Sequence, residues 1–224
     1  MGKLIAIDGV DASGKQTQTS LLYERLVNLG ISVRKVSFPA YDSPSSELVK
    51  MYLAGEFGKN PADVNAYAAS TFYAADRFAT YRRDWQRDYE NDTLILADRY
   101  VSSNMIHQGG KLANSAEKDR FLDWLYELEH KIYALPVPDL TIFLDMPVKQ
   151  ASELMKNRDN KITSASEKDI HETNFDYLTA SYENACYIAE KYGWRTVCCA
   201  PQGDVRGIED INEEIMALVL PLIG

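Results

Sequence analysis

Short apolar runs alternate along this chain with longer segments in which apolar residues recur at helical spacing. The short runs predict five buried strands, over residues 4–7, 31–38, 93–97, 140–144 and 194–199. The longer segments predict helices over residues 16–29, 46–53, 61–89, 117–133, 148–157, 167–192 and 208–220. Alternating strands and helices are typical of a parallel sheet covered on both faces. We therefore predict an α/β fold around a five-stranded parallel sheet.

The end of the first predicted strand carries the clearest chemical signal. It reads Gly9-Val10-Asp11-Ala12-Ser13-Gly14-Lys15, and a helical pattern follows at once. Glycines let backbone N–H groups curl around a phosphate, and the following helix presents its positive end to the same anion. We interpret residues 9–17 as a phosphate-binding loop in which the lysine follows the phosphate oxygens.

The position after this lysine departs from the usual pattern. It normally holds Ser or Thr, whose hydroxyl binds Mg²⁺, whereas this chain has Gln16 followed by Thr17. Gln16 could offer its side-chain carbonyl to the metal or to a metal-bound water, and Thr17 is expected to contact a phosphate. Asp98, at the end of the third predicted strand, could accept a hydrogen bond from a metal-bound water. Gln16 and Asp98 are thus the predicted metal contacts.

Composition and charge restrict the partners. The formal net charge of −9 argues against a duplex nucleic acid, which needs a basic face. No apolar run approaches the roughly 20 residues of a membrane span, and residues 4–7 are too few for the apolar part of a signal peptide. The cysteines are Cys186, Cys198 and Cys199, an odd number that argues against a disulfide framework and favours the cytoplasm.

Further candidates for the chemistry are predicted to lie where ligands bind in parallel sheets, beyond the carboxyl ends of the strands. They are Phe38-Pro39, Asp98-Arg99 and Asp145. The planar guanidinium of Arg99 could hold phosphate oxygens through two hydrogen bonds. The alternative is that Asp98 and Arg99 form a structural pair at the strand end.

Two further pairs suit a nucleotide acceptor. Tyr73 and Arg77 share one helix face and could hold an aromatic ring and a phosphate. The alternative is a core tyrosine beside a surface arginine, with Asp76 and Arg77 forming a solvated pair. His107 and Gln108 have no second histidine nearby, so we interpret them as polar lining for a substrate rather than as metal ligands.

A basic, irregular segment lies between two predicted helices. It contains Lys156, Arg158 and Lys161 and spans about residues 155–168. Such a segment is typical of a lid that closes over a nucleotide and delivers an arginine to the transferring phosphoryl group. The alternative is an ordinary solvated loop.

Together these blocks resemble the thymidylate kinases, a group of P-loop nucleoside monophosphate kinases. The matching blocks are residues 9–17, Phe38-Pro39 with Tyr41, residues 71–77, residues 98–108 and the lid segment. Asp98-Arg99-Tyr100 followed by Ser103-Asn104 is specific to this group, and the likeness spans residues 4 to about 180. The resemblance implies a single kinase domain over residues 1–224 that transfers the γ-phosphoryl group of ATP to dTMP, with Mg²⁺, in dTTP biosynthesis.

The resemblance also implies roles for single residues. Lys15 contacts the donor phosphates, and Asp11 lies between the loop and the acceptor. Tyr73 takes the place of an aromatic residue that stacks on thymine, Arg77 resembles the arginine at the acceptor phosphate or base edge, and Arg99 the arginine that bridges both substrates. The implied donor contacts are Gly9, Val10, Asp11, Ala12, Ser13, Gly14, Lys15, Gln16, Thr17 and Arg158. The implied acceptor contacts are Asp11, Phe38, Pro39, Tyr41, Tyr73, Arg77, Arg99, Ser103, Asn104, His107 and Gln108.

Among these, Asn104 resembles a thymine-facing residue, and His107 falls near the sugar 2′ position. In this family a catalytic arginine sits either in the phosphate loop or in the lid. Because the loop here has Ala12 and Ser13, the lid is expected to supply it. Arg158 is the candidate and Lys161 the rival, so the implied catalytic residues are Lys15, Arg99, Arg158 and Asp11.

Three further expectations can be tested. We expect a cis peptide bond between Phe38 and Pro39. We expect a homodimer that uses helices of residues 61–133, in which a face of small residues packs closely; these are Ala66, Ala69, Ser70 and Ala74. The alternative is that this face is buried in the core of a single protomer. Two other activities remain open: a nucleoside or nucleotide kinase with a different base preference, and a non-catalytic nucleotide-dependent switch.

Overall fold

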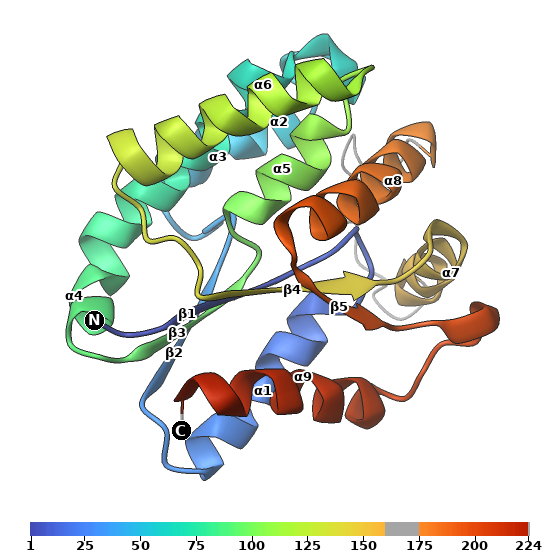
Figure 1. Cartoon of the computed structure of the whole chain (residues 1–224). Helices are drawn as coiled ribbons and strands as arrows, with labels where there is room; N and C mark the ends of the chain where they lie inside the picture. The colour runs from blue at the N-terminus through green and yellow to red at the C-terminus, as the bar shows by residue number, and fades with distance from the viewer. Residues whose placement is uncertain (160–174, 224) are drawn as a thin grey trace.

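The computed structural model describes residues 1–159 and 175–223, with residues 156–159 described by their backbone alone. Its sheet is parallel throughout, with the strand order β2-β3-β1-β4-β5, which confirms the predicted α/β fold (Figure 1). The strands are β1 (Leu4–Asp8), β2 (Val33–Ser37), β3 (Leu94–Asp98), β4 (Leu140–Asp145) and β5 (Arg195–Cys198).

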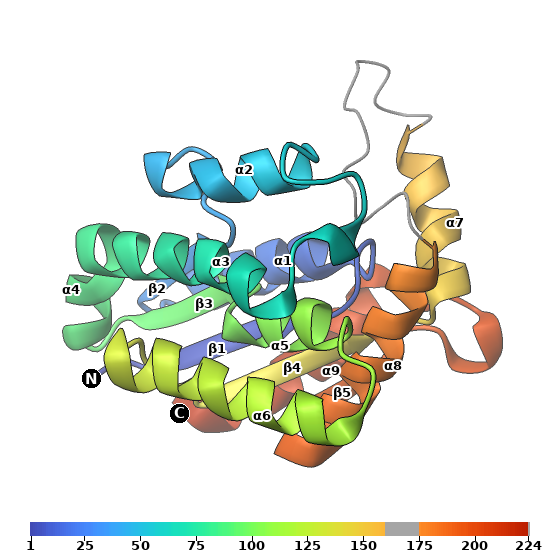
Figure 2. The same cartoon turned by 90° about the horizontal axis from the view of Figure 1, so that it is seen from above.

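Helices cover both faces of this sheet. The α-helices of the described part are α1 (Lys15–Asn28), α2 (Glu47–Leu53), α3 (Ala66–Thr80), α4 (Gln86–Glu90), α5 (Val101–Gly109), α6 (Ser115–Tyr126), α7 (Val148–Asp159), α8 (Phe175–Tyr192) and α9 (Ile208–Ile223). Helices α1 and α9 lie together on one face, whereas α3, α5, α6 and α8 lie on the other (Figures 1 and 2). None of the helices within the described ranges is long and apolar enough to cross a bilayer.

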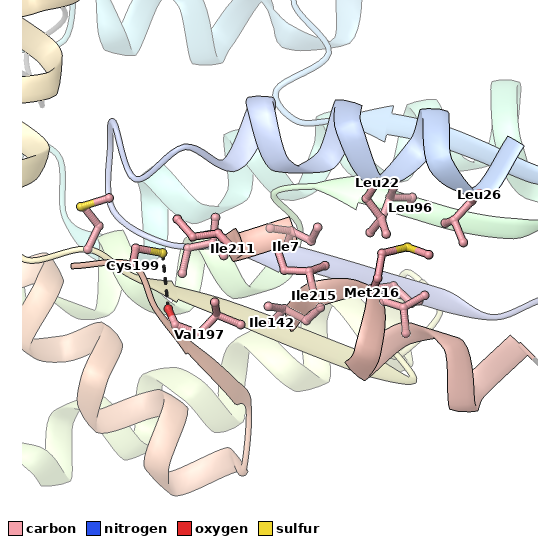
Figure 3. Close-up of a cluster of buried hydrophobic side chains, with 14 of the residues drawn as sticks. Ile7, Leu22, Leu26, Leu96, Ile142, Val197, Cys199, Ile211, Ile215 and Met216 are labelled. Carbon is pink, nitrogen blue, oxygen red and sulfur yellow. Dashed lines mark hydrogen bonds between the residues drawn. The ribbon is translucent and has the colours of Figure 1, made fainter. Parts of the chain in front are cut away.

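The side chains of β1 alternate between two hydrophobic cores. Ile5 and Ile7 belong to the core beside α1 and α9, which also contains Leu22 and Ile215. Figure 3 shows Ile7 between these two helices. Leu4 and Ala6 point to the opposite face and join the second core. Because successive side chains of a strand face opposite sides, a strand covered on both faces must be apolar throughout. This double burial explains why the central strands appear as uninterrupted apolar runs.

Two predicted helices are interrupted. Residues 61–89 form a 3₁₀ turn (Pro61–Asp63), then α3, a π-helical segment η3 (Tyr81–Trp85) and α4. Helix α6 likewise continues into a π-helical segment, η4 (Glu127–Ile132). Helix α5 was not predicted, because much of its buried surface is polar and no apolar stripe marks it.

The face of small residues on α3 does not match the expectation of an intermolecular contact. Ala66, Ala69, Ser70 and Ala74 are all buried within the chain, with Ala69 and Ala74 0% exposed. Helix α3 packs there against neighbours that include α5 and the 3₁₀ turn Pro44–Ser46. The small side chains allow this close packing inside one protomer, so that face cannot contact a second copy.

Candidate active site

The phosphate loop joins β1 to α1, and two of its positions require glycine. A Cβ on Gly9 would lie 2.7 Å from Ser13 Oγ and 2.9 Å from the carbonyl oxygen of Leu144, which is too close for any side chain. Gly14 has a φ of +89°, in the left-handed region that glycine tolerates. Helix α1 begins directly after it without a side-chain cap, so its first N–H groups can bind an anion.

Lys15 is held inside the loop that it serves. Its ammonium donates to the carbonyl oxygens of Gly9 at 3.0 Å and Val10 at 2.6 Å. Burial lowers the pKa of Lys15 to about 8, and the nearby Arg99 charge adds to this shift. The ammonium therefore remains mostly charged at neutral pH, and a phosphate group could replace its carbonyl partners.

Two cavities open at the carboxyl ends of the strands. The first is lined by every residue assigned to the acceptor, together with Leu53; these are Asp11, Phe38, Pro39, Tyr41, Tyr73, Arg77, Arg99, Ser103, Asn104, His107 and Gln108. The second is lined by loop residues 11–17 and by Asp98 and Arg99. Asp11, Phe38, Pro39, Tyr41 and Arg99 line both. The cavities therefore adjoin. Gly9 and Val10 lie outside both linings, and their carbonyl oxygens accept hydrogen bonds from Lys15.

Arg99 stands at the junction of the cavities in a strained backbone conformation. Its φ is +66°, an uncommon value that costs about 1–3 kcal/mol for a residue other than glycine. Its guanidinium forms an ion pair with Asp11 and donates to His107 Nε2 at 3.2 Å. Since arginine only donates, Nε2 accepts and the imidazole proton sits on Nδ1. Burial acts to lower the pKa of Arg99, but the carboxylates of Asp11, Asp8 and Asp98 outweigh it and raise the pKa.

Asp8 anchors the loop to α5, a role that the sequence analysis missed. Its buried carboxylate accepts hydrogen bonds from the Gly9 N–H at 2.9 Å, the Ser102 hydroxyl at 2.7 Å and the Ser103 hydroxyl at 2.9 Å. Since Ser103 gives its only hydroxyl proton to Asp8, it can only accept from a ligand. The signal in the sequence was a carboxylate that ends an otherwise apolar strand.

Arg77 is buried, which rules out the alternative of a surface arginine. Its Nε and Nη2 each donate at 2.6 Å to the Glu129 carboxylate, and Nη1 lies 3.4 Å from the carbonyl oxygen of Tyr100. Burial acts to lower the pKa of Arg77, but Glu129 outweighs it and raises the pKa. Asn104 Nδ2 donates to Ser70 O at 3.1 Å and lies 3.3 Å from Glu129 Oε1.

Glu129 is the second site residue that the sequence analysis missed. It lies in η4 and is 0% exposed. The signal was present in the sequence, because Phe121, Leu125 and Glu129 follow one another at helical spacing along a buried face. A carboxylate on such a face requires a buried partner.

Asp76 is also buried rather than solvated. Its carboxylate accepts from the Ala40 N–H at 2.8 Å and from the Ser45 hydroxyl at 2.6 Å. These bonds fix the segment that follows the Phe38–Pro39 peptide bond, which is cis as predicted. Helix α3 thus positions the part of the wall that both cavities share.

The remaining candidates have different positions. Asp98 lines the second cavity, and burial raises the pKa of its carboxyl group. Asp145 lies outside both cavities' linings and accepts a hydrogen bond from Tyr182 at 2.8 Å. The side chain of Arg158 and all of Lys161 lie outside the described residues. Arg206, which was not predicted, also lines the second cavity.

Comparisons with known proteins identify the family. A model of the thymidylate kinase family matches residues 7–202 of the chain. The chain belongs to the thymidylate kinase family. The matched range contains the phosphate loop, the whole lining of the first cavity, the end of β1 and strands β2 to β5.

Individual thymidylate kinases are similar along most of their length. A probable thymidylate kinase from Thermococcus kodakarensis is 27% identical over 225 residues, covering 98% of each chain. The thymidylate kinase from Mycobacterium tuberculosis is 31% identical over 158 residues, covering 69% of this chain and 71% of the other. A solved structure of the Candida albicans thymidylate kinase shares the fold, with a TM-score of 0.71, 21% identity, and coverage of 98% of this chain and 92% of that one.

Proposed function

We propose that this thymidylate kinase family member transfers the γ-phosphoryl group of ATP to dTMP, giving dTDP and ADP. The observation that carries the proposal is the junction of the two cavities at Asp11 and Arg99. One cavity contains a phosphate loop, and the other contains aromatic and arginine side chains. A donor phosphate and an acceptor phosphate would therefore meet beside one guanidinium.

The protein's own residues would act by positioning and by charge. In phosphoryl transfer the charge of a loose transition state lies on the oxygens, so cations fixed before the reaction stabilise it. Lys15 would leave its carbonyl partners for the donor phosphates, and Arg99 would bridge both substrates. Asp11 would hold Arg99 in place, and Arg158 would reach the transferring group from the proposed lid.

The second cavity contains the phosphate loop, and we call it the donor cavity. It fits a Mg²⁺ ion that arrives with the nucleotide. Within the described residues, no group of three His, Cys, Asp or Glu side chains could hold a metal on its own. In nucleotide sites, however, Mg²⁺ typically takes one or two carboxylates plus phosphates and waters. Asp98 supplies such a carboxylate, and its side chain has no hydrogen-bond partner among the described residues. Asp98 and Gln16 are the proposed contacts, and the ion would neutralise charge on the phosphates.

The remaining parts of the proposal concern the whole molecule. We place residues 1–224 in one kinase domain with a lid at about 155–168, acting in the cytoplasm without nucleic acid or membrane partners. A homodimer remains part of the proposal, but it must use exposed side chains of the helices in residues 61–133. Tyr67 and Phe78 on α3, each 38% exposed, are available for this contact.

The test is ADP production from ATP and Mg²⁺ with each nucleoside monophosphate and nucleoside in turn. We expect dTMP to give the highest kcat/KM, and Lys15→Ala to abolish turnover while the circular dichroism spectrum stays unchanged. Preference for a nucleoside would instead indicate a nucleoside kinase. ADP formed at the same rate without any acceptor would indicate a nucleotide-dependent switch.

A further inference from the structure

Glu129 lies directly behind the wall of the first cavity, which we call the acceptor cavity. The cavity is lined by Arg77 and Asn104 but not by Glu129, which is 0% exposed. Its Oε2 accepts from Arg77 Nε at 2.6 Å, and its Oε1 accepts from Arg77 Nη2 at 2.6 Å and from Asn104 Nδ2 at 3.3 Å. One carboxylate therefore holds both of these cavity-lining side chains.

These bonds fix which atoms Asn104 can present to a ligand. Its Nδ2 group has two hydrogens, and they are directed to Ser70 O at 3.1 Å and to Glu129. Its Oδ1 accepts no hydrogen bond from any residue that the structure describes. An amide held in this orientation offers the cavity an acceptor and no donor.

The same carboxylate fixes the opposite property in Arg77. Two of its five N–H groups are directed to Glu129, so the guanidinium plane cannot rotate without breaking both bonds. The remaining N–H groups can only donate. The wall of the cavity thus presents a donor from Arg77 beside an acceptor from Asn104.

We propose that Glu129 is a positioning residue that sets the choice of base, by holding Arg77 as a donor and Asn104 as an acceptor. This inference rests on the proposed function. The pairing edge of thymine presents an O4 acceptor and an N3–H donor, which complement that wall. Cytosine presents an N4–H donor and an N3 acceptor at the same places. Its donor would then face the Arg77 donor, and its acceptor would face the Asn104 acceptor.

A purely structural role for Glu129 would have a different signature. As a mere counter-charge for buried Arg77, Glu129 would affect stability and all acceptors equally. As a positioning residue, it affects the ratio between acceptors. Glu129→Gln keeps the shape but brings an NH₂ group to Arg77 and Asn104. The Asn104 amide can then turn, with its oxygen toward Gln and its NH₂ toward the base.

The experiment measures kcat and KM for dTMP and dCMP in wild type, Glu129→Gln and Glu129→Asp. Glu129→Asp keeps the charge that Arg77 needs, but its shorter side chain cannot reach Arg77 and Asn104 together. The matched control is Glu127→Gln, an exposed residue of the same π-helical segment that pairs with Lys131 at 3.0 Å. Binding of each monophosphate is also measured by calorimetry without ATP.

We expect the dTMP-to-dCMP ratio of kcat/KM to fall at least tenfold in both Glu129 variants, mainly through KM for dTMP. The binding ratio should fall with it, and Glu127→Gln should match wild type. An unchanged ratio in folded variants overturns the inference, as does failure of both variants to fold, which would make Glu129 structural. A wild-type protein inactive on dTMP refutes the proposed function instead, so the two failures are distinguishable.

Discussion

Replacing Asp8 by alanine should strongly destabilise the protein, although Asp8 touches neither proposed substrate. The carboxylate is 0% exposed, and three donors converge on it, from Gly9, Ser102 and Ser103. A hydrogen bond to a charged group contributes about 1.5–3 kcal/mol. The two hydroxyls can turn toward other acceptors, whereas the Gly9 N–H cannot. Counting the equivalent of two lost bonds, we expect the free energy of unfolding to fall by about 3–6 kcal/mol.

This loss is a large part of the roughly 5–15 kcal/mol by which domains of this kind are stable. Urea unfolding followed by tryptophan fluorescence would measure it. With an m-value of about 2–3 kcal/mol/M, the midpoint should fall by about 1–3 M. The control is Asp123→Ala, an exposed position on α6, which should change the free energy of unfolding by less than about 0.5 kcal/mol. A loss below about 1 kcal/mol for Asp8→Ala would refute the reasoning, because no buried hydrogen-bond network would then depend on this carboxylate.

Three other predictions concern activity and pH. Arg99→Lys keeps the charge but loses the planar guanidinium, so kcat should fall while the circular dichroism spectrum stays unchanged. A variant with the kcat of wild type would contradict the proposal that Arg99 bridges both substrates. Arg158→Ala should lower kcat about 10³-fold, as for an arginine finger, with dTMP binding little changed. Near-normal turnover would show that Arg158 is not the catalytic cation, and Lys161 would be the next residue to test. Burial lowers the pKa of Lys111 to about 7, from 10.5 when unfolded. The unfolded chain then binds more protons between these values, so the free energy of unfolding should rise with pH above 7, and Lys111→Met should flatten this rise in urea titrations.

The central sheet could be predicted because its strands are buried on both faces. Double burial removes the polar residues that would obscure the pattern, so β1, β3 and β4 appear directly as apolar runs. Helix α5 has the opposite property. Its buried residues include Ser102, Asn104, His107 and Gln108, which face the acceptor cavity or the loop rather than a hydrophobic core. A helix whose inner face is a binding site carries no apolar stripe, and periodicity cannot find it.

The residues of the candidate site also differ in how well the sequence predicts them. Residues at strand ends and in the phosphate loop could be predicted, since the parallel sheet brings those ends to one edge. The sequence pattern could indicate that Asp8 and Glu129 are buried, but not which residues they bind. Glu129 reaches Arg77 across 52 positions of sequence, and Asp8 reaches Ser103 across 95. Such partners are fixed by the packing of helices on the sheet, which local sequence does not encode. The small-residue face of α3 shows the same limit. Small residues predict that another element packs closely against the helix, but not whether that element belongs to the same chain or to a second copy.

The shared wall of the two cavities has a consequence for altering this enzyme by directed evolution. Asp11, Tyr41 and Arg99 belong to both linings, so we expect a substitution there to change the affinities for the proposed donor and the proposed acceptor together. Variants selected for a new acceptor at these positions would carry a penalty in ATP use. Tyr73 and Asn104 line the acceptor cavity alone. Libraries of variants confined to residues that line the acceptor cavity alone can be selected for new acceptor nucleotides, while the residues that line the donor cavity stay unchanged.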